Sequence, residues 1–349
     1  MYFGGCEGGA SHSSVVITNK DGVILGEASG EGTNSCLIGV PECCKRIADL
    51  AQKAKVAAGL GPEVVLQSLG MSLSGADYQE RMDEISKHML ENFPQVALHC
   101  HTCNDTLSPL VTATDGGGVV IIAGTGSNCL LVNPSGASKN CGGWGHFIGD
   151  EGSACWMVLQ TIKTIYHDSD GFVLAPHSTE FLKKELFDYF GMTDLFGILT
   201  HLYPPSGKID KAFIARFCVN GIVKGCRAGD ALSLHVMRNT GIMLGRHVKA
   251  LIPRMENALL QENQNTGLKI ICVGSVWKSW EFLKDGFLEG ITPVTDEEKT
   301  LKKFSLVNLK EGAKASVGAA AWASKKNGDD NILNLDYSKT SNIFYQHEF

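Results

Sequence analysis

The stretch Asp115-Gly116-Gly117-Gly118-Val119-Val120-Ile121-Ile122-Ala123-Gly124-Thr125-Gly126-Ser127-Asn128 decides how the rest of the chain is interpreted. Its β-branched run, bounded by glycines, predicts a buried strand that enters a tight turn. Gly124 and Gly126 remove the Cβ atoms that would keep a ligand from the backbone. The N–H groups of such a turn can form an anion-binding nest, beside which Thr125 places a hydroxyl. Taken alone, the stretch fits an ordinary hairpin equally well.

The N-terminus carries a second stretch of the same kind. Gly4-Gly5-Cys6-Glu7-Gly8-Gly9-Ala10-Ser11-His12-Ser13 leads directly into the apolar run Val15–Ile17. A turn and another strand-like segment follow each of the two glycine turns. Two phosphate-type hairpins roughly 120 residues apart predict a duplicated α/β fold with a nucleotide between its halves. A third strand, 268–273, ends at Gly274-Ser275, a turn suited to the base or ribose of that nucleotide.

Composition excludes several classes of protein. The chain has 349 residues, 44% hydrophobic and 19% charged, which is typical of a globular protein with two domains. Its net charge of −6 and its lack of a Lys/Arg-rich stretch argue against a nucleic-acid partner. No apolar run approaches the roughly 20 residues of a membrane span. The N-terminus lacks a signal peptide, so we expect a cytoplasmic protein.

The twelve cysteines follow no regular spacing. In a chain of this size without an export signal, they are expected to be reduced and mostly buried. The segment His99-Cys100-His101-Thr102-Cys103 resembles half of a zinc site. It reads instead as a strand, which sends neighbouring side chains to opposite faces, and the second ligand pair is missing.

Asp105 is the candidate catalytic residue. It follows a predicted strand, 96–103, and a carboxylate at the C-terminal end of such a strand faces the crevice where α/β domains bind ligands. The alternative is a plain helix N-cap, and the local sequence does not separate the two. The position of Asp105 between two phosphate-type hairpins favours catalysis.

Five glycines surround one tryptophan, one histidine and two acids in the segment 142–153. This composition suits a close-walled pocket with an aromatic platform better than a core. Asp150 could reach ligand hydroxyls or cap the helix that follows. Simple packing is the alternative for Trp144.

These motifs resemble the superfamily of sugar kinases, actin and heat-shock chaperone ATPases, and more narrowly the eukaryotic N-acetyl-D-glucosamine kinases. The likeness extends over nearly the whole chain. It rests on Glu7-Gly8-Gly9, Thr33-Asn34, Leu73-Ser74-Gly75, Gly124-Thr125-Gly126-Ser127-Asn128, Cys141-Gly142-Gly143-Trp144-Gly145-His146, Gly149-Asp150-Glu151-Gly152-Ser153, Gly197-Ile198-Leu199-Thr200-His201-Leu202-Tyr203 and Cys272-Val273-Gly274-Ser275-Val276-Trp277-Lys278-Ser279-Trp280.

The resemblance implies two duplicated actin-like, ribonuclease H-like ATPase domains, residues 1–115 and 116–349, with a ligand cleft between them and the last residues packing back on the first domain. It implies ATP-dependent phosphorylation of the 6-hydroxyl of N-acetyl-D-glucosamine, in amino-sugar salvage, by a cytosolic, Mg²⁺-dependent homodimer. Asp105 corresponds to the general base. The other site residues fall into three sets: Asn34, Asn128, Gly143, Trp144, Gly145 and Asp150 for the sugar; Gly8, Gly9, Ser11, Gly124, Thr125 and Gly126 for the phosphates; Gly274 and Ser275 for the nucleoside. Glu7 is expected to touch Mg²⁺ through water, since this ion usually keeps several waters.

The chain departs from the family pattern at the first hairpin. The family usually has a third glycine and a basic residue where Ala10 and His12 stand here, and often an aromatic residue at the position of Cys36. A non-catalytic sugar sensor or scaffold is therefore one alternative. Another is a related activator-type ATPase that drives electron transfer through an iron–sulfur cluster. A P-loop ATPase is disfavoured because no Gly-x-x-x-x-Gly-Lys-Ser/Thr sequence occurs.

Overall fold

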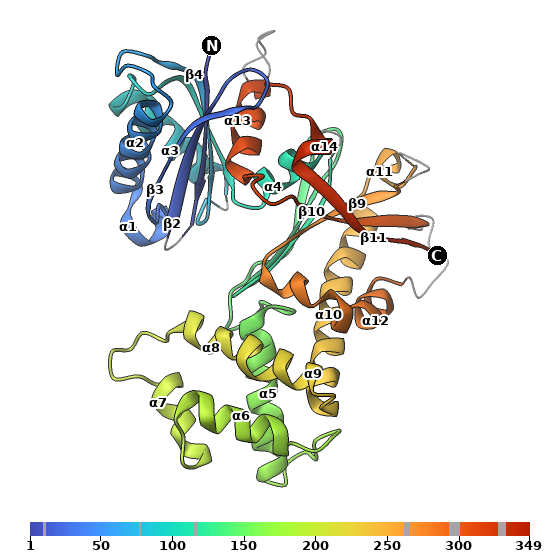
Figure 1. Cartoon of the computed structure of the whole chain (residues 1–349). Coiled ribbons are helices and arrows are strands. Elements are labelled where there is room, and N and C mark those ends of the chain that lie inside the picture. Colours follow the sequence, from blue (N-terminus) through green and yellow to red (C-terminus); the bar gives the residue numbers. More distant parts are fainter. Residues whose placement is uncertain (10–11, 77, 115–116, 262–265, 293–300, 327–332) are drawn as a thin grey trace.

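The computed structural model of the chain describes all residues except 10–11, 77, 115–116, 262–265, 293–300 and 327–332. Its two mixed sheets lie side by side, and a group of helices extends from the second sheet, as Figure 1 shows. Among the helices of these residues, none combines the length and apolar character that a bilayer span requires. The domain boundary predicted at residues 115 and 116 falls outside the described residues.

The N-terminal sheet has the order β3-β2-β1-β4-β5. Its first three strands form an antiparallel meander, and β4 and β5 continue it in parallel with β1. The strands are β1 (Phe3–Gly8), β2 (His12–Thr18), β3 (Ile24–Glu31), β4 (Leu66–Leu73) and β5 (Ala97–Asn104). Helices α1 (Ser35–Ile38), α2 (Val40–Ala57) and α3 (Gln79–Asn92) complete this part of the chain. Pro41 lies in the first turn of α2, and the apolar stripe of this helix is buried against the sheet.

The second sheet repeats this order with one strand added, β8-β7-β6-β9-β10-β11. Its members are β6 (Gly118–Ala123), β7 (Ser127–Val132), β8 (Ser138–Gly142), β9 (Leu268–Val273), β10 (Lys303–Leu309) and β11 (Ser341–Glu348). Here too, two antiparallel pairings are followed by two parallel ones, and β11 closes the edge in the antiparallel sense. The repeated topology confirms the predicted duplicated α/β fold.

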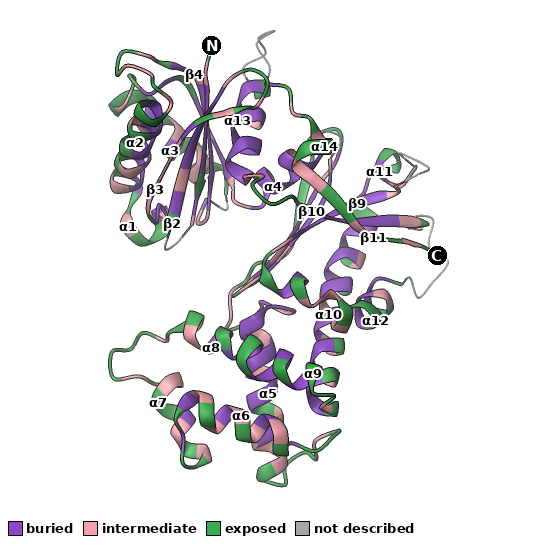
Figure 2. Cartoon of the chain, viewed as in Figure 1, coloured by how far each residue is buried: buried purple, intermediate pink, exposed green. Residues whose placement is uncertain are grey.

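The helices between β8 and β10 pack on one face of the second sheet, opposite to the face that Leu110 contacts, and extend away from it. They are α5 (Ala154–Ser169), α6 (Glu180–Phe190), α7 (Leu199–Leu202), α8 (Lys211–Phe217), α9 (Lys224–Arg227), α10 (Ala231–Leu251), α11 (Asn257–Gln261) and α12 (Trp280–Ile291). A π-helical turn, Cys218–Val223, joins α8 to α9, and short 3₁₀ turns occupy Leu195–Ile198, Ile252–Arg254 and Ser275–Ser279. Asp230 caps α10 by accepting a hydrogen bond from the Ser233 N–H. Figure 2 shows the central strands of both sheets largely buried, whereas β8 and β11 at the edges of the second sheet carry exposed residues and α6 to α8 mix buried, intermediate and exposed ones.

Two helices, α4 (Leu107–Ala113) and α13 (Ala315–Lys326), lie between the sheets. Leu110 of α4 packs against the second sheet, while α13 lies directly on Gly5 and Gly70 of the first. A Cβ atom on Gly5 would stand 1.8 Å from the Ser316 carbonyl oxygen, so the α13 backbone touches the sheet with no side chain between them. A last helix, α14 (Tyr337–Thr340), leads into β11. This helix pair therefore connects the two sheets at the point where the chain crosses between them.

Candidate active site

The first hairpin joins β1 to β2. The Gly9 N–H donates to the His12 carbonyl over 2.9 Å, and the Gly9 carbonyl accepts from the Thr33 N–H over 3.0 Å. The adjoining Gly8 carbonyl accepts from the Ser74 N–H over 2.8 Å. The backbone therefore draws three of the quoted motifs together at one end of the sheet. Ala10 and Ser11 lie outside the described residues, so the phosphate contact of Ser11 stays a prediction.

Asn34 is fixed at this end of the sheet by both halves of its amide. Its Nδ2 donates to the Ser74 hydroxyl over 3.0 Å, and its Oδ1 accepts from the Cys36 N–H over 2.9 Å at the start of α1. Gly75, with φ of +83°, packs against the same amide. Asn34 is thus held in one orientation at the strand ends, where a ligand hydroxyl could meet it.

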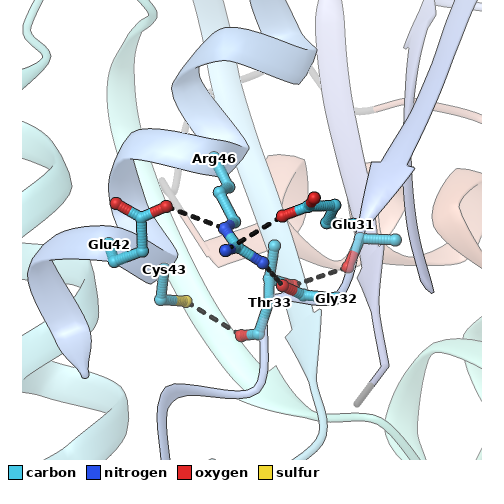
Figure 3. A network of polar contacts seen from close by, with 7 residues as sticks. Glu31, Gly32, Thr33, Glu42, Cys43 and Arg46 are labelled. Carbon is cyan, nitrogen blue, oxygen red and sulfur yellow. Dashed lines mark hydrogen bonds and ion pairs between the residues drawn. The ribbon is translucent and has the colours of Figure 1, made fainter. Parts of the chain in front are cut away.

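The loop that carries Asn34 is held in place from α2. Arg46 donates to the Gly32 carbonyl over 2.9 Å and forms ion pairs with Glu42 at 2.9 Å and Glu31 at 3.0 Å. The Cys43 thiol donates to the Thr33 carbonyl over 3.0 Å. Figure 3 shows these groups converging on residues 31–33. This role of Arg46 is not predictable from the sequence, because its position off the apolar stripe of α2 is also that of a solvated side chain.

Asp105 follows β5 directly. In the register of β4 and β5, Leu73 is paired with Asn104, so Ser74 and Asp105 follow as neighbours at the same edge of the sheet. The Ser72 hydroxyl donates to the Asn104 carbonyl over 3.1 Å, which fixes the backbone just before Asp105. The N-cap position of α4 is Thr106, so Asp105 lies one residue before it. The strand register therefore places Asp105 at the same edge of the sheet as Ser74, the hydrogen-bond partner of Asn34.

The second hairpin, between β6 and β7, is closed by the start of α5. The Gly124 N–H donates to the Gly126 carbonyl over 2.9 Å, and the Gly124 carbonyl accepts from the Ala154 N–H over 2.8 Å. Thr125, at the tip, is exposed. The turn is therefore held by its own backbone, which leaves the Thr125 hydroxyl to a ligand.

Asp150 lies buried behind this hairpin, and its side chain is 6% exposed. Its Oδ1 accepts from the Ser127 N–H over 3.2 Å, and its Oδ2 accepts from the Lys211 Nζ over 2.6 Å. Its φ of +61° is the one positive value among the non-glycine residues that the structure describes. Apart from glycine, which has no Cβ atom, residues other than asparagine and aspartate seldom adopt this conformation. The backbone is therefore bent specifically to aim this carboxylate at the hairpin.

Asn128 and Gly143 come together through the pairing of β7 with β8. Asn128 lies opposite Gly142 in the register, and Gly143 packs against the Asn128 amide. The predicted sugar residues of the second half thus surround one end of β7, and Gly145 accepts from the Gly149 N–H over 2.8 Å in the loop above it. Trp144 is 73% exposed, so packing in the core does not account for it.

Two of the predicted nucleotide residues line a cavity of about 110 Å³. Thr125 of the hairpin and Ser275 of the late glycine turn both line it, together with Ala215 and Arg216 of α8. Gly274, with φ of +105°, lies so close to the hairpin that a Cβ atom would stand 2.3 Å from the Ala123 carbonyl oxygen. The Trp277 indole N–H donates to the Ile121 carbonyl over 3.2 Å and fixes the turn on β6. One residue from each of these two segments therefore lines the same cavity, and the binding of a nucleoside there stays a prediction.

Glu7 faces a second cavity, of about 350 Å³, between the two sheets. Its walls include His12 and Ser14 from the first sheet and Val273 and Leu309 from the second. Loss of solvent in this cavity raises the pKa of Glu7, which His12 and Lys314 lower in part. No group of three or more His, Cys, Asp and Glu side chains forms a metal cage in the part of the chain that the structure describes. A single carboxylate fits Mg²⁺ bound mainly by phosphate and water.

One further charged group near the site, Lys211, had no signal in the sequence. Lys211 reaches Asp150 across 61 positions of sequence, and burial together with the Lys211 charge lowers the pKa of His146.

All twelve cysteines are free, and only Cys36 is exposed. This agrees with the prediction of reduced, mostly buried thiols.

Comparison with known proteins assigns the family. Residues 5–323 match the sequence profile of the BadF/BadG/BcrA/BcrD ATPase family, and the chain belongs to that family. It is 27% identical to an N-acetylmuramic acid/N-acetylglucosamine kinase of Clostridium acetobutylicum, over 49% of this chain and 51% of that protein. It is 29% identical to an N-acetyl-D-glucosamine kinase of Dictyostelium discoideum, over 53% of this chain and 60% of that protein. The chain thus spans between half and three fifths of the length of these curated relatives.

Solved structures show the same fold. A Chromobacterium violaceum protein, provisionally named an N-acetylglucosamine kinase, aligns over 91% of this chain and 97% of its own with a TM-score of 0.65 and 21% identity. A ROK family glucokinase of Streptomyces griseus, solved with glucose and AMPPNP, aligns over 93% of this chain and all of its own with a TM-score of 0.53 and 12% identity.

Proposed function

We propose that this member of the BadF/BadG/BcrA/BcrD ATPase family is an amino-sugar kinase that phosphorylates the 6-hydroxyl of N-acetyl-D-glucosamine and yields N-acetylglucosamine 6-phosphate. The observation that supports the proposal is the register of β4 and β5, which ends both strands at the edge of the sheet where Ser74 holds Asn34 and where Asp105 follows β5. The names of the curated relatives support an amino sugar as the acceptor. Salvage of free amino sugars in the cytoplasm by a homodimer is the setting that the sequence resemblance favours.

Asn34, on the first sheet, and Asn128, Gly143, Trp144, Gly145 and Asp150, on the second, would hold the sugar. An amide and a carboxylate fixed by neighbouring groups offer a sugar ring both donors and acceptors in set positions. Asp105 would then accept the proton of the 6-hydroxyl, a role typically worth ~10²–10⁴-fold in rate. The orientation of the 6-hydroxyl toward Asp105 would decide which oxygen of the sugar is deprotonated.

On the nucleotide side, Gly8, Gly9, Ser11, Gly124, Thr125 and Gly126 would hold the phosphates, and Gly274 and Ser275 the nucleoside. ATP, when bound with Mg²⁺, supplies the phosphoryl group, and Glu7 would contact the ion through water. Phosphoryl transfer depends mainly on positioning and charge neutralisation, which fits a site built from backbone N–H groups and short hydroxyls. The cavity that Glu7 faces has walls from both sheets, and closure of the domains over it would exclude water.

The buried state of most cysteines argues against the activator-type alternative. A cluster shared at a dimer interface requires cysteines that reach the surface, and ten of the twelve thiols are buried. Burial raises the pKa of Cys100, Cys103 and Cys218 to about 12, which opposes the thiolate form that metal ligation uses.

The test is release of ADP from Mg·ATP in the presence of glucose, N-acetylglucosamine, N-acetylmannosamine or muramyl dipeptide. We expect turnover with an N-acetyl sugar that falls about 10²–10⁴-fold in Asp105→Asn. Asp21→Asn, an exposed turn residue between β2 and β3, is the matched control and should keep full activity. Sugar binding without ADP release would instead support a sensor, and near-full activity of Asp105→Asn would remove the general base from the proposal.

A further inference from the structure

The ion pair between Lys211 and Asp150 lies directly against the second hairpin. A Cβ atom on Gly126 would stand 3.2 Å from the Lys211 Nζ and 3.1 Å from each carboxylate oxygen of Asp150. The Lys211 side chain is 29% exposed, whereas that of Asp150 is 6% exposed. The ammonium group therefore sits at the boundary between the buried carboxylate and solvent, in contact with the hairpin.

Lys211 also adjoins the nucleotide cavity through its own helix. It is the first residue of α8, and Ala212, Ala215 and Arg216 of that helix line the cavity with Thr125. The side chain thus stands between the residues proposed for the phosphates and the carboxylate proposed for the sugar. A lysine is a flexible, compact cation, so it can exchange one anionic partner for another with little movement of the backbone.

While Lys211 holds Oδ2, the Asp150 carboxylate is engaged on both oxygens, because the Ser127 N–H holds Oδ1. Each oxygen can accept a further hydrogen bond, but the Asp150 side chain is only 6% exposed, so a sugar hydroxyl gains access to Oδ2 when the ammonium group moves away. Phosphate oxygens at the hairpin offer that ammonium a more highly charged partner within its reach.

We infer that Lys211 couples the two substrates of this enzyme: it pairs with Asp150 in the nucleotide-free protein and turns to the phosphates of a bound nucleoside triphosphate, which leaves Asp150 to accept a sugar hydroxyl. The inference rests on the proposed function, because it assigns phosphate to the hairpin and sugar to Asp150. It makes Lys211 a positioning residue for the sugar and adds a requirement that nucleotide binding tightens sugar binding.

Calorimetric titration of N-acetyl-D-glucosamine, with and without Mg·AMPPNP, measures this coupling directly. In the wild-type protein we expect the nucleotide to lower the sugar Kd about tenfold, a typical coupling between two sites. Lys211→Ala and Lys211→Gln should bind the sugar equally with and without nucleotide, and Lys211→Gln also keeps a hydrogen-bond donor beside Asp150 should the alanine variant fold poorly. Lys211→Arg should retain most of the coupling. Lys208→Ala, at an exposed lysine in the loop that precedes α8, is the matched control and should behave as wild type.

A wild-type coupling ratio in Lys211→Gln and Lys211→Ala would overturn the inference, because a purely structural role shifts stability and leaves that ratio unchanged. The outcomes for the two proposals are distinguishable. Loss of coupling in the variants together with a wild-type protein that forms no sugar phosphate would support the role of Lys211 and contradict the kinase function. Unchanged coupling in the variants together with normal sugar phosphorylation would contradict the role of Lys211 and support the kinase function. Absence of sugar binding in the wild-type protein would contradict both proposals.

Discussion

Replacing Gly274 by alanine tests how the nucleotide turn is seated on the second hairpin. Its φ of +105° is strained for any residue with a Cβ atom, and that atom would stand 2.3 Å from the Ala123 carbonyl oxygen. Real Cβ atoms essentially never approach within 3.0 Å, so the turn and the hairpin must separate by about 0.7 Å. Because Ser275 and Thr125 line the cavity from these two segments, the separation deforms the nucleotide site itself.

Two costs add in this variant. Positive φ at a non-glycine residue costs roughly 1–2 kcal/mol, and overpacking against a backbone typically costs about 1–3 kcal/mol. We therefore expect Gly274→Ala to lower the free energy of unfolding by about 2–5 kcal/mol. A misplacement approaching 1 Å can cost up to about 10²-fold in catalysis, so kcat/KM for ATP should fall by about 10- to 100-fold.

Gly136→Ala is the matched control for the strain alone. Gly136 has φ of +87° in the turn between β7 and β8, and its Cβ would meet nothing within 4 Å. Guanidinium unfolding followed by tryptophan fluorescence, with ATP kinetics on the folded fraction, compares the two variants. Gly136→Ala should lose about 1–2 kcal/mol and keep its KM for ATP. Equal stability losses in the two variants, with the KM for ATP unchanged in Gly274→Ala, would refute the contact between turn and hairpin as the reason for this glycine.

Two further predictions concern sugar binding and pH. Arg46→Ala removes the bonds that hold residues 31–33, so it should raise the KM for the sugar several-fold and change the KM for ATP little. Arg46→Lys loses the forked geometry of the guanidinium group, so its KM for the sugar should lie between those of the wild type and Arg46→Ala. Equal effects on the KM values of both substrates would contradict this role of Arg46. Burial lowers the pKa of His247 below its ordinary value near 6.5, so the unfolded chain binds more protons as pH falls through that value. The corresponding stability is present above pH 6.5 and lost below it, by at most about 1.4 kcal/mol per pH unit, and chemical unfolding at pH 7.5 and 5.5 should show a smaller difference in His247→Gln than in wild type. An unchanged difference would contradict the assignment to His247, and His99→Gln on the exposed part of β5 serves as control.

The strand-and-glycine framework is predictable from sequence because its signals are local. A β-branched run is buried on both faces in β6, and the strand predicted at 268–273 is β9 with the same bounds. Asp230 caps α10 as its position before an amphipathic stretch predicts. By contrast, β11 is a half-buried edge strand, so its residues carry no clear apolar alternation.

The candidate site is predictable only in part, since its remaining contacts join distant segments. Asp105 could be placed at a strand end, but that it shares an edge of the sheet with Ser74 and Asn34 depends on the register of β4 and β5. Lys211 meets Asp150 from the other side of a helical insertion, and no spacing rule connects the two. Arg46 looks like any charged residue on an exposed helix face until the loop at 31–33 folds over it.

The most direct test of the central claim is transfer of phosphate from γ-labelled Mg·ATP to N-acetyl-D-glucosamine, with the 6-deoxy sugar as the control. The account predicts a labelled sugar phosphate from N-acetyl-D-glucosamine, none from the 6-deoxy analogue, and about 10²–10⁴-fold less product from Asp105→Asn. No labelled sugar from either compound, or equal labelling of both, would contradict phosphorylation at the 6-hydroxyl.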